Sequence, residues 1–273
     1  MATCYRHPSR ETGVSCANCA RPICPDCMTT TPVGMRCPEC SKQRTKVVRM
    51  REVASIPRVT YALIAINVVA FLAEKGQFTI AGSEIHGTVI DEGVLYRAGI
   101  SEGHQYWRLL TSAFLHENLI HIGFNMYLLY LLGMMLEPAI GSTRFALIYF
   151  AALFVGSFGA VFETANPSLG ASGAIFGLMG AAVVELRSRG ISVMRSGIGG
   201  LIIINLIFSF TFSNISVGDH IAGLAGGFLA GLAIREADRR RMPALGFVAC
   251  VLLAAAGIFA AIAVSGASGS GIA

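Results

Sequence analysis

The chain has 273 residues, of which 54% carry hydrophobic side chains and only 14% are charged, and its mean hydropathy is +0.63. Soluble domains carry about a quarter charged residues, so this composition excludes an ordinary soluble globule, and the apolar content excludes a disordered chain. The net charge of +5 does not by itself indicate nucleic-acid binding, because the positions of the basic residues decide what they do.

Residues 1–42 are polar and hold seven of the eight cysteines. Potential metal ligands occur there as four pairs with two intervening residues, namely Cys4 and His7, Cys16 and Cys19, Cys24 and Cys27, and Cys37 and Cys40. Eight such ligands suffice for two tetrahedral Zn²⁺ ions, which would supply the folding free energy that so short a segment lacks. The alternative is an oxidised or free-thiol cluster; a reducing cytoplasm disfavours disulfides, and the regular spacing of the pairs favours metal ligands over free thiols. We therefore expect a zinc-binding domain with two structural ions.

A basic linker, residues 43–58, precedes seven apolar segments at about residues 59–73, 118–136, 144–162, 171–185, 197–212, 219–234 and 244–265. The second, third and seventh are long enough to cross about 30 Å of hydrocarbon as plain helices. The fourth and sixth are short, rich in glycine and carry Ser or His, so we expect interior helices that the others cover. The sequence therefore predicts an all-α polytopic membrane protein.

The basic residues indicate how the chain crosses the membrane. With the N-terminus inside, the inner connections hold fourteen Lys and Arg residues, whereas the outer connections hold three, Lys75, Arg97 and Arg108. This asymmetry agrees with the positive-inside rule. We expect a multi-pass protein of the plasma membrane, surrounded by lipid, with a cytoplasmic N-terminus and an external C-terminus. Because most of the positive charge then sets topology, we expect no nucleic-acid partner.

Three polar clusters occur within the apolar segments, where polar side chains are costly and therefore informative. His121 and Asn125 are four residues apart and share one face of the second segment. Ser172 opens the fourth segment between glycines, and His220 opens the sixth. By the orientation above, all of them lie near the outer ends of their helices.

Glycines at helical spacing favour close contact between the fourth and sixth segments, which would bring Ser172 toward His220. They are Gly173, Gly177 and Gly180 on the fourth segment, and Gly223 and Gly227 on the sixth. A neutral His beside a Ser can take its proton as the Ser attacks a carbonyl, and His121 and Asn125 would donate to the oxyanion.

Each of these residues also has a structural interpretation when it is taken singly. Ser172 would be a small packing residue or helix cap, His220 a hydrogen-bonded core histidine, and Asn125 an interhelical contact. Asp219, next to His220, is interpreted as a cap or loop carboxylate and not as a third member of a triad, because adjacent helical side chains diverge by about 100°. The joint occurrence of the polar groups at one depth favours a catalytic site.

Residues 59–235 resemble a rhomboid intramembrane serine protease. The resemblance rests on Trp107-Arg108, on His116, His121 and Asn125, on Glu137, on Gly170-Ala-Ser172-Gly173, and on the run from His220 to Gly227. It implies a core of six transmembrane helices, with a seventh helix and the tail in residues 236–273. Glu137 and Trp107-Arg108 would be structural positions, and His116 would organise polar groups near the site.

The same resemblance implies a serine endopeptidase in which Ser172 is the nucleophile and His220 the general base. His121, Asn125 and the backbone N–H of Ser172 would form the oxyanion hole, and catalysis would need no metal. The substrates would be single-pass or multi-pass membrane proteins cleaved in or near a transmembrane segment. Phe176 departs from the family pattern, in which many members have Tyr, but we expect its ring still to stack on His220.

Residues 1–42 resemble a B-box-type zinc finger. That resemblance implies a cross-braced arrangement, with Cys4, His7, Cys24 and Cys27 on one ion and Cys16, Cys19, Cys37 and Cys40 on the other. The spacing alone leaves consecutive pairing open. Such a domain could bind a cytosolic protein partner, regulate access or only stabilise the N-terminus.

Two other classes of function remain as alternatives to a protease. A non-catalytic membrane receptor or adaptor would bind helices through its polar core and recruit partners through the zinc finger. A small-solute transporter would line a pathway with His116, His121, Asn125 and His220. A transporter would favour inverted repeats or charged groups at mid-membrane, and the sequence has neither.

Overall fold

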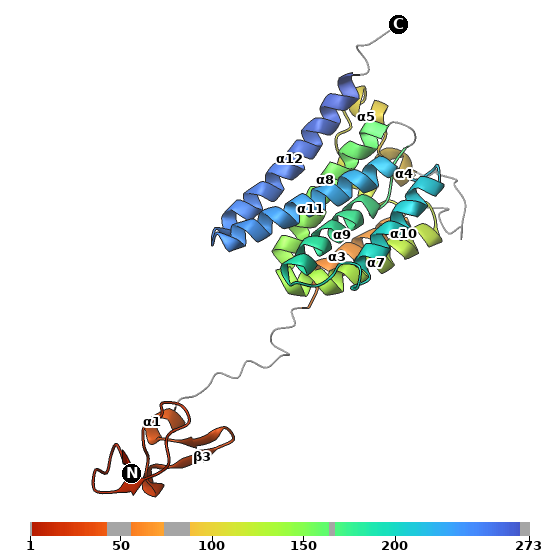
Figure 1. The fold of residues 1–273 in the computed structure, drawn as a ribbon. Helices are drawn as coiled ribbons and strands as arrows, with labels where there is room; N and C mark the ends of the chain where they lie inside the picture. The colour runs from red at the N-terminus through yellow and green to blue at the C-terminus, as the bar shows by residue number, and fades with distance from the viewer. Residues whose placement is uncertain (1, 43–55, 74–87, 164–166, 268–273) are drawn as a thin grey trace. The chain divides into compact units, whose positions relative to one another are not determined.

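The computed structural model describes residues 2–42, 56–73, 88–163 and 167–267. The chain divides into two compact units, Met1–Ala54 and Ser55–Ala273. The first is a small cysteine-rich domain and the second is helical (Figure 1). Most of the linker expected at residues 43–58 lies outside the described residues.

In residues 2–42, the described part of the N-terminal unit (called the head below), the chain forms two short hairpins and two helical turns. Strand β1 (Ala2–Thr3) pairs antiparallel with β2 (Glu11–Thr12), and β3 (Thr29–Thr31) pairs antiparallel with β4 (Gly34–Arg36). The helical turns are η1 (Pro25–Cys27) and α1 (Pro38–Ser41). Its buried apolar side chains are Ile23 and six cysteines, Cys4, Cys16, Cys24, Cys27, Cys37 and Cys40. A core of this kind contains almost no aliphatic surface, so its stability depends on what the sulfur atoms bind.

The described residues of the helical unit form seven long helices, and each falls on one of the apolar segments predicted from the sequence. They are α3 (Arg58–Ala73), α7 (Leu119–Ile140), α8 (Ser142–Glu163), α9 (Ser172–Ser188), α10 (Ile198–Thr211), α11 (Val217–Arg239) and α12 (Pro243–Ala267). Shorter helices lie between α3 and α7, namely α4 (Thr88–Gly93), α5 (Arg97–Ser101), α6 (Arg108–Thr111) and η2 (Ser112–Phe114). The prediction of a helical fold is confirmed.

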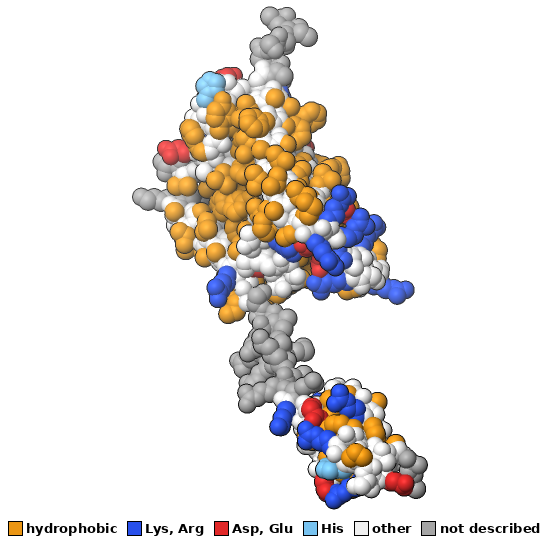
Figure 2. Space-filling view, turned by 90° about the vertical axis from the view of Figure 1, so that its left-hand side faces the viewer, with side chains coloured by type: hydrophobic (Ala, Val, Ile, Leu, Met, Phe, Trp, Pro, Cys, Tyr) orange, Lys and Arg blue, Asp and Glu red, His pale blue; other side chains and the backbone are white. Residues whose placement is uncertain are grey.

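Four helices of the described residues, α7, α8, α11 and α12, are long and apolar enough to cross a membrane, while α3 and α10 are apolar but shorter. Figure 2 shows hydrophobic side chains covering one face of this unit, with Lys and Arg gathered at one end. Exposed apolar side chains of this density are costly in water and favourable in lipid. The chain is a multi-pass membrane protein.

The expectation that the sixth segment forms a short helix is wrong. Helix α11 has 23 residues, because it continues past the apolar stretch into a charged last turn. There Glu236 pairs with Arg239 three residues on and with Arg240 four residues on. Such pairs, together with basic side chains near a helix C-terminus, stabilise a polar last turn.

Helix α9 is interior, as predicted. All residues from Gly173 to Ala182 are buried, and the helix packs against α7, α8, α10 and α11. Helix α12 packs against α8 and α11, and its outer side chains, among them Leu252 and Phe259, are exposed. The polar N-terminus of α9 therefore lies inside a shell of apolar helices.

Helices α9 and α11 meet at backbone contact, which confirms the role predicted for their glycines. A Cβ atom at position 223 would lie 2.2 Å from the carbonyl oxygen of Gly173, and one at position 227 would lie 2.0 Å from that of Gly177. No side chain fits at these distances. The glycines therefore determine how closely the two helices approach.

Glu137 ties α7 to the first turn of α3, in agreement with the structural position that the resemblance implies for it. Its fully buried carboxylate accepts hydrogen bonds from the backbone N–H of Val59 at 2.9 Å and from that of Thr60 at 2.8 Å. The hydroxyls of Thr60 and Ser142 also donate to it, at 2.7 and 2.6 Å. One carboxylate thus satisfies donors at the start of two other helices.

Replacing Glu137 with Ala should lower the free energy of unfolding by about 3 kcal/mol or more, because it leaves two buried N–H groups without an acceptor. Thermal unfolding in detergent would measure the loss. The matched control is Glu185→Ala, which removes a carboxylate paired with the half-exposed Arg189 and should cost about 1 kcal/mol or less. Equal midpoints for the two variants would contradict this role for Glu137.

Candidate active site and metal centres

A cavity of about 470 Å³ lies at the N-terminal ends of α7, α9 and α11 and the C-terminal end of α10. All four residues expected to carry catalysis line it, namely Ser172, His220, His121 and Asn125. Much of the remaining wall is apolar and includes Ile175, Phe208 and Phe212. The structure thus brings together residues from three helices that lie far apart in the sequence.

Ser172 is the first residue of α9, and its position depends on the turn before it. Gly170 has a φ of +117°, which favours glycine, and its N–H donates to the carbonyl of Ser112 at 2.8 Å. The backbone two residues before Gly170 is anchored as well, since Ser168 exchanges backbone hydrogen bonds with Leu95. The Ser172 hydroxyl therefore enters the cavity from an anchored backbone.

His220 lies in the first turn of α11 and is only 7% exposed. Its Nε2 lies 2.7 Å from Oγ of Ser172, within hydrogen-bond distance. The ring stacks on Phe176, with centroids 4.3 Å apart and planes 21° apart, so the predicted stacking is confirmed. The other ring nitrogen, Nδ1, lies 2.6 Å from Oγ of Ser209 on α10. Sequence reasoning missed Ser209, whose one signal was a hydroxyl within an apolar helix.

His121 and Asn125 face the cavity from the start of α7. Asn118 caps this helix, since its side-chain oxygen accepts from the backbone N–H of His121 at 2.9 Å. Asn125 is buried and its side-chain amide donates to the carbonyl of His121 at 3.0 Å. A Cβ atom at position 170 would lie 2.7 Å from Nε2 of His121, so this imidazole faces the backbone just before Ser172.

Two ionisable groups precede α7, beside the cavity. Desolvation lowers the pKa of the His116 imidazole well below its ordinary value, and the nearby His121 adds to this effect. The two rings lie edge to face, with centroids 5.0 Å apart. Desolvation also raises the pKa of the Glu117 carboxyl. His116 is therefore neutral at physiological pH and places no full charge beside His121.

Asp219 differs in part from its sequence interpretation. The cap of α11 is Ser216, whose hydroxyl accepts from the N–H of Asp219 at 3.1 Å, so Asp219 is neither the cap nor a loop residue. Its carboxylate packs on the start of α9, where a Cβ atom at position 173 would lie 2.2 Å from Oδ1. Its side chain also hydrogen-bonds Ser172, whereas Nδ1 of His220 meets Ser209 and not Asp219.

Trp107 and Arg108 hold the connection between α4 and α6, as structural positions. The guanidinium of Arg108 is buried, donates to the carbonyls of Asp91 and Val94 at 2.9 and 2.8 Å, and lies over the ring of Tyr96. The indole N–H of Trp107 donates to the carbonyl of Glu92 at 3.0 Å. Neither side chain lines the cavity.

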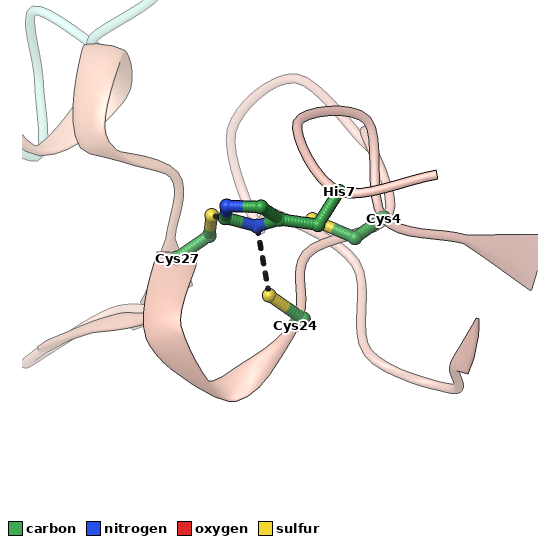
Figure 3. A group of neighbouring side chains, drawn as sticks. All are labelled: Cys4, His7, Cys24 and Cys27. Atoms are coloured by element: carbon green, nitrogen blue, oxygen red, sulfur yellow. Dashed lines mark hydrogen bonds between the residues drawn. The ribbon is translucent and has the colours of Figure 1, made fainter. Parts of the chain in front are cut away.

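The head gathers its eight candidate ligands into the two cross-braced sets and not into consecutive pairs. One set is Cys4, His7, Cys24 and Cys27, and the other is Cys16, Cys19, Cys37 and Cys40. Figure 3 shows the four side chains of the first set pointing toward one another. Each set could hold one metal ion.

The distances fit tetrahedral zinc. Zinc–sulfur bonds of about 2.3 Å place two sulfur atoms about 3.8 Å apart and a sulfur and an imidazole nitrogen about 3.5 Å apart. The Sγ atoms of Cys19 and Cys37 are 3.8 Å apart, and Nδ1 of His7 lies 3.4 Å from Sγ of both Cys24 and Cys27. Backbone N–H groups also donate to sulfur, from Cys37 to Cys16 and from Cys40 to Cys37. Such bonds stabilise thiolates, the form that binds metal.

Comparison with known proteins places these features in context. A family model described as the Rhomboid domain matches residues 103–237. Rhomboid protease GluP of Bacillus subtilis (strain 168) is 40% identical over 181 residues, which are 65% of this chain and 35% of the relative. Putative rhomboid protease YdcA of the same organism is 36% identical over 151 residues, which are 53% of this chain and 75% of the relative.

One similar protein lacks activity by its name. Inactive RHOMBOID-like protein 8 of Arabidopsis thaliana is 36% identical over 141 residues, which are 50% of this chain and 39% of the relative. The match to GluP spans about a third of that protein's length. Similarity therefore identifies the fold, and the side chains at the cavity must carry the argument for activity.

Proposed function

The chain belongs to the rhomboid family, and we propose that it is an intramembrane serine protease that cleaves other membrane proteins in or near their transmembrane segments. The observation that carries this proposal is the distance of 2.7 Å between Oγ of Ser172 and Nε2 of His220 inside the cavity. The name of one similar protein, Rhomboid protease GluP, supports it.

In the proposed reaction, Oγ of Ser172 attacks the carbonyl carbon of the scissile peptide bond while Nε2 of His220 accepts the hydroxyl proton. The resulting oxyanion accepts hydrogen bonds from the side chains of His121 and Asn125 and from the backbone N–H of Ser172. Each such donor is worth a few kcal/mol of transition-state stabilisation. His220 then passes its proton to the leaving amine, and an acyl group remains on Ser172.

Water completes the cycle. His220 takes a proton from a water molecule as it attacks the acyl carbon, and returns that proton to Ser172 as the new carboxyl group leaves. The dyad thus supplies both nucleophile and base. The bond to be cut must leave its helix first, because helical backbone is closed to attack, so we expect helix-weakening residues near the cleavage site.

The arrangement in the membrane is part of the proposal. We assign residues 59–235 to a six-helix core and residues 236–273 to a seventh helix and tail, in the plasma membrane, with the N-terminus cytoplasmic and the cavity at the outer ends of the helices. The excess of Lys and Arg in the inner connections supports this orientation. Substrates are single-pass or multi-pass membrane proteins that reach the cavity through the lipid.

Residues 1–42 bind two structural Zn²⁺ ions in this proposal, through the two four-residue sets of the head. The S···S and N···S distances given above support zinc over an oxidised cluster. Zinc there supplies folding free energy, and a cytosolic protein is the partner proposed for the head.

A fluorophosphonate probe tests the proposed activity, because it reacts covalently with an activated serine. The purified full-length protein in detergent should be labelled. The labelling rate should fall at least 100-fold in both Ser172→Ala and His220→Ala. The matched control is Ser168→Ala, since Ser168 lines the same cavity and is held by backbone hydrogen bonds to Leu95, which the substitution keeps. Folded protein with no labelling that depends on Ser172 would favour the receptor or adaptor alternative.

A further inference from the structure

The hydrogen bonds of Ser209 determine the protonation of His220. Oγ of Ser209 lies 2.8 Å from the backbone carbonyl of Asn205, one turn earlier in α10, and 2.6 Å from Nδ1 of His220. A hydroxyl has one proton to donate, and a carbonyl can only accept. The Ser209 proton therefore lies on the bond to Asn205, and the second bond must be donated by Nδ1–H of His220.

This arrangement leaves Nε2 of His220 without a proton. A neutral imidazole carries one N–H, so a proton held on Nδ1 makes Nε2 the acceptor. Nε2 is the atom that lies 2.7 Å from the hydroxyl of Ser172. The chain of bonds from Asn205 through Ser209 and His220 to Ser172 thus runs in a single direction, and its last bond prepares Ser172 for deprotonation.

From this geometry we propose that Ser209 is a positioning residue, whose hydroxyl holds His220 in the tautomer and orientation that accept the proton of Ser172. The inference rests on the proposed function and extends it, because it gives the dyad a third member on a third helix. Ser209 meets His220 at Nδ1 and not at Nε2, the atom that faces Ser172, so it acts through His220.

The surroundings of His220 support this role. Ser209 is 2% exposed and His220 is 7% exposed, so water does not replace the hydroxyl readily. Phe176 stacks on one face of the ring, which fixes the plane, while the bond from Nδ1 fixes the rotation within that plane. Among the described residues, His220 has no hydrogen bond to a carboxylate. The Ser209 oxygen is thus the acceptor that can stabilise the imidazolium formed during the reaction.

Three substitutions at position 209 separate the hydroxyl from its volume. Ser209→Ala removes the hydroxyl. Ser209→Thr keeps it and adds a methyl group, and Ser209→Val has the shape of the Thr variant without the hydroxyl. The labelling rate of Ser209→Thr divided by that of Ser209→Val therefore gives the contribution of the hydroxyl, because the effect of the added methyl group is common to both variants. The matched control is Thr211→Val, since the exposed Thr211 makes the same bond to a carbonyl four residues earlier at 2.7 Å.

The measurement is the rate of fluorophosphonate labelling as a function of probe concentration, with unfolding midpoints recorded for each variant. We expect Ser209→Ala and Ser209→Val to lower the maximal rate about 10- to 100-fold, with half-saturating probe concentrations within about twofold of wild type. Ser209→Thr should exceed Ser209→Val by about tenfold or more, and Thr211→Val should label like wild type.

The outcomes distinguish this inference from the function on which it rests. Equal rates for Ser209→Thr and Ser209→Val, or an unchanged rate for Ser209→Ala, overturn the role of Ser209 and leave the protease intact. A wild-type protein without labelling at Ser172 overturns the proposed function and the inference together. If the labelling rate falls in proportion to the unfolding midpoint across all variants, Ser209 contributes only to packing. That result would also overturn the proposed positioning role.

Discussion

Adding a strong chelator to the zinc-loaded, full-length protein should unfold the head completely and leave the helical unit folded. The described part of the head has a buried core of six cysteines and one isoleucine, so little apolar surface holds it together. Structural zinc in small domains contributes about 10 to 16 kcal/mol of apparent binding free energy, which is also their folding free energy. Limited proteolysis, followed alongside bound zinc, would detect the transition.

Single substitutions make the same test without a chelator. Cys37 is fully buried within its set of four, so Cys37→Ser should release zinc and open the head to protease. The matched control is Cys250→Ser, because Cys250 is equally buried but lies in α12, outside both sets. Fluorophosphonate labelling should survive in both variants, since Ser172 and His220 belong to the helical unit and Cys37 to the other compact unit. A head that resists protease without zinc would contradict the structural role of the metal.

The sequence predicts the helices well because each is an uninterrupted apolar run bounded by polar or turn residues. The expected helix length is wrong where a helix continues beyond its apolar run. In α11 the additional last turn is stabilised by ion pairs of Glu236 with Arg239 and Arg240. Hydrophobic periodicity contains no signal for such a turn, because its stability comes from side-chain pairs at helical spacing.

For the cavity, the sequence identifies the residues that are chemically unusual in an apolar helix. Ser172, His220, His121 and Asn125 fall in this class, and the structure brings all four to one cavity. Ser209 does not stand out, because a serine that bonds to the carbonyl four residues earlier is an ordinary feature of membrane helices. Its second bond, to His220, depends on how α10 lies against α11, which local sequence does not encode.

The metal sets and Asp219 illustrate the same limit. Regular spacing predicts four pairs of ligands, but whether neighbouring or alternate pairs share an ion depends on the chain path, so the sequence left both arrangements open. Aspartate is a common residue type at helix N-caps, and Asp219 lies near the start of α11, yet Ser216 three residues earlier is the cap. Its carboxylate instead meets Gly173 at the start of α9, a contact between residues 46 apart in the chain that only packing reveals.

Placing a side chain at position 227 should abolish labelling at Ser172 and lower the free energy of unfolding by more than about 4 kcal/mol. A Cβ atom there would lie 2.0 Å from the carbonyl oxygen of Gly177 and 2.4 Å from its Cα, so even Gly227→Ala must push α9 and α11 apart. Ser172 and His220 lie on the same two helices, five residues before Gly177 and seven residues before Gly227. The measurements are the unfolding midpoint and the labelling rate.

The matched control is Gly200→Ala in α10, where a Cβ atom would meet nothing within 4 Å, so the higher helix propensity of alanine should leave stability unchanged or slightly raised. A wild-type midpoint and rate for Gly227→Ala would contradict the close contact between α9 and α11. A folded Gly227→Ala protein with a lowered rate would be the more informative result. It would mean that the distance between α9 and α11 sets the geometry of Ser172 and His220, because neither side chain touches position 227.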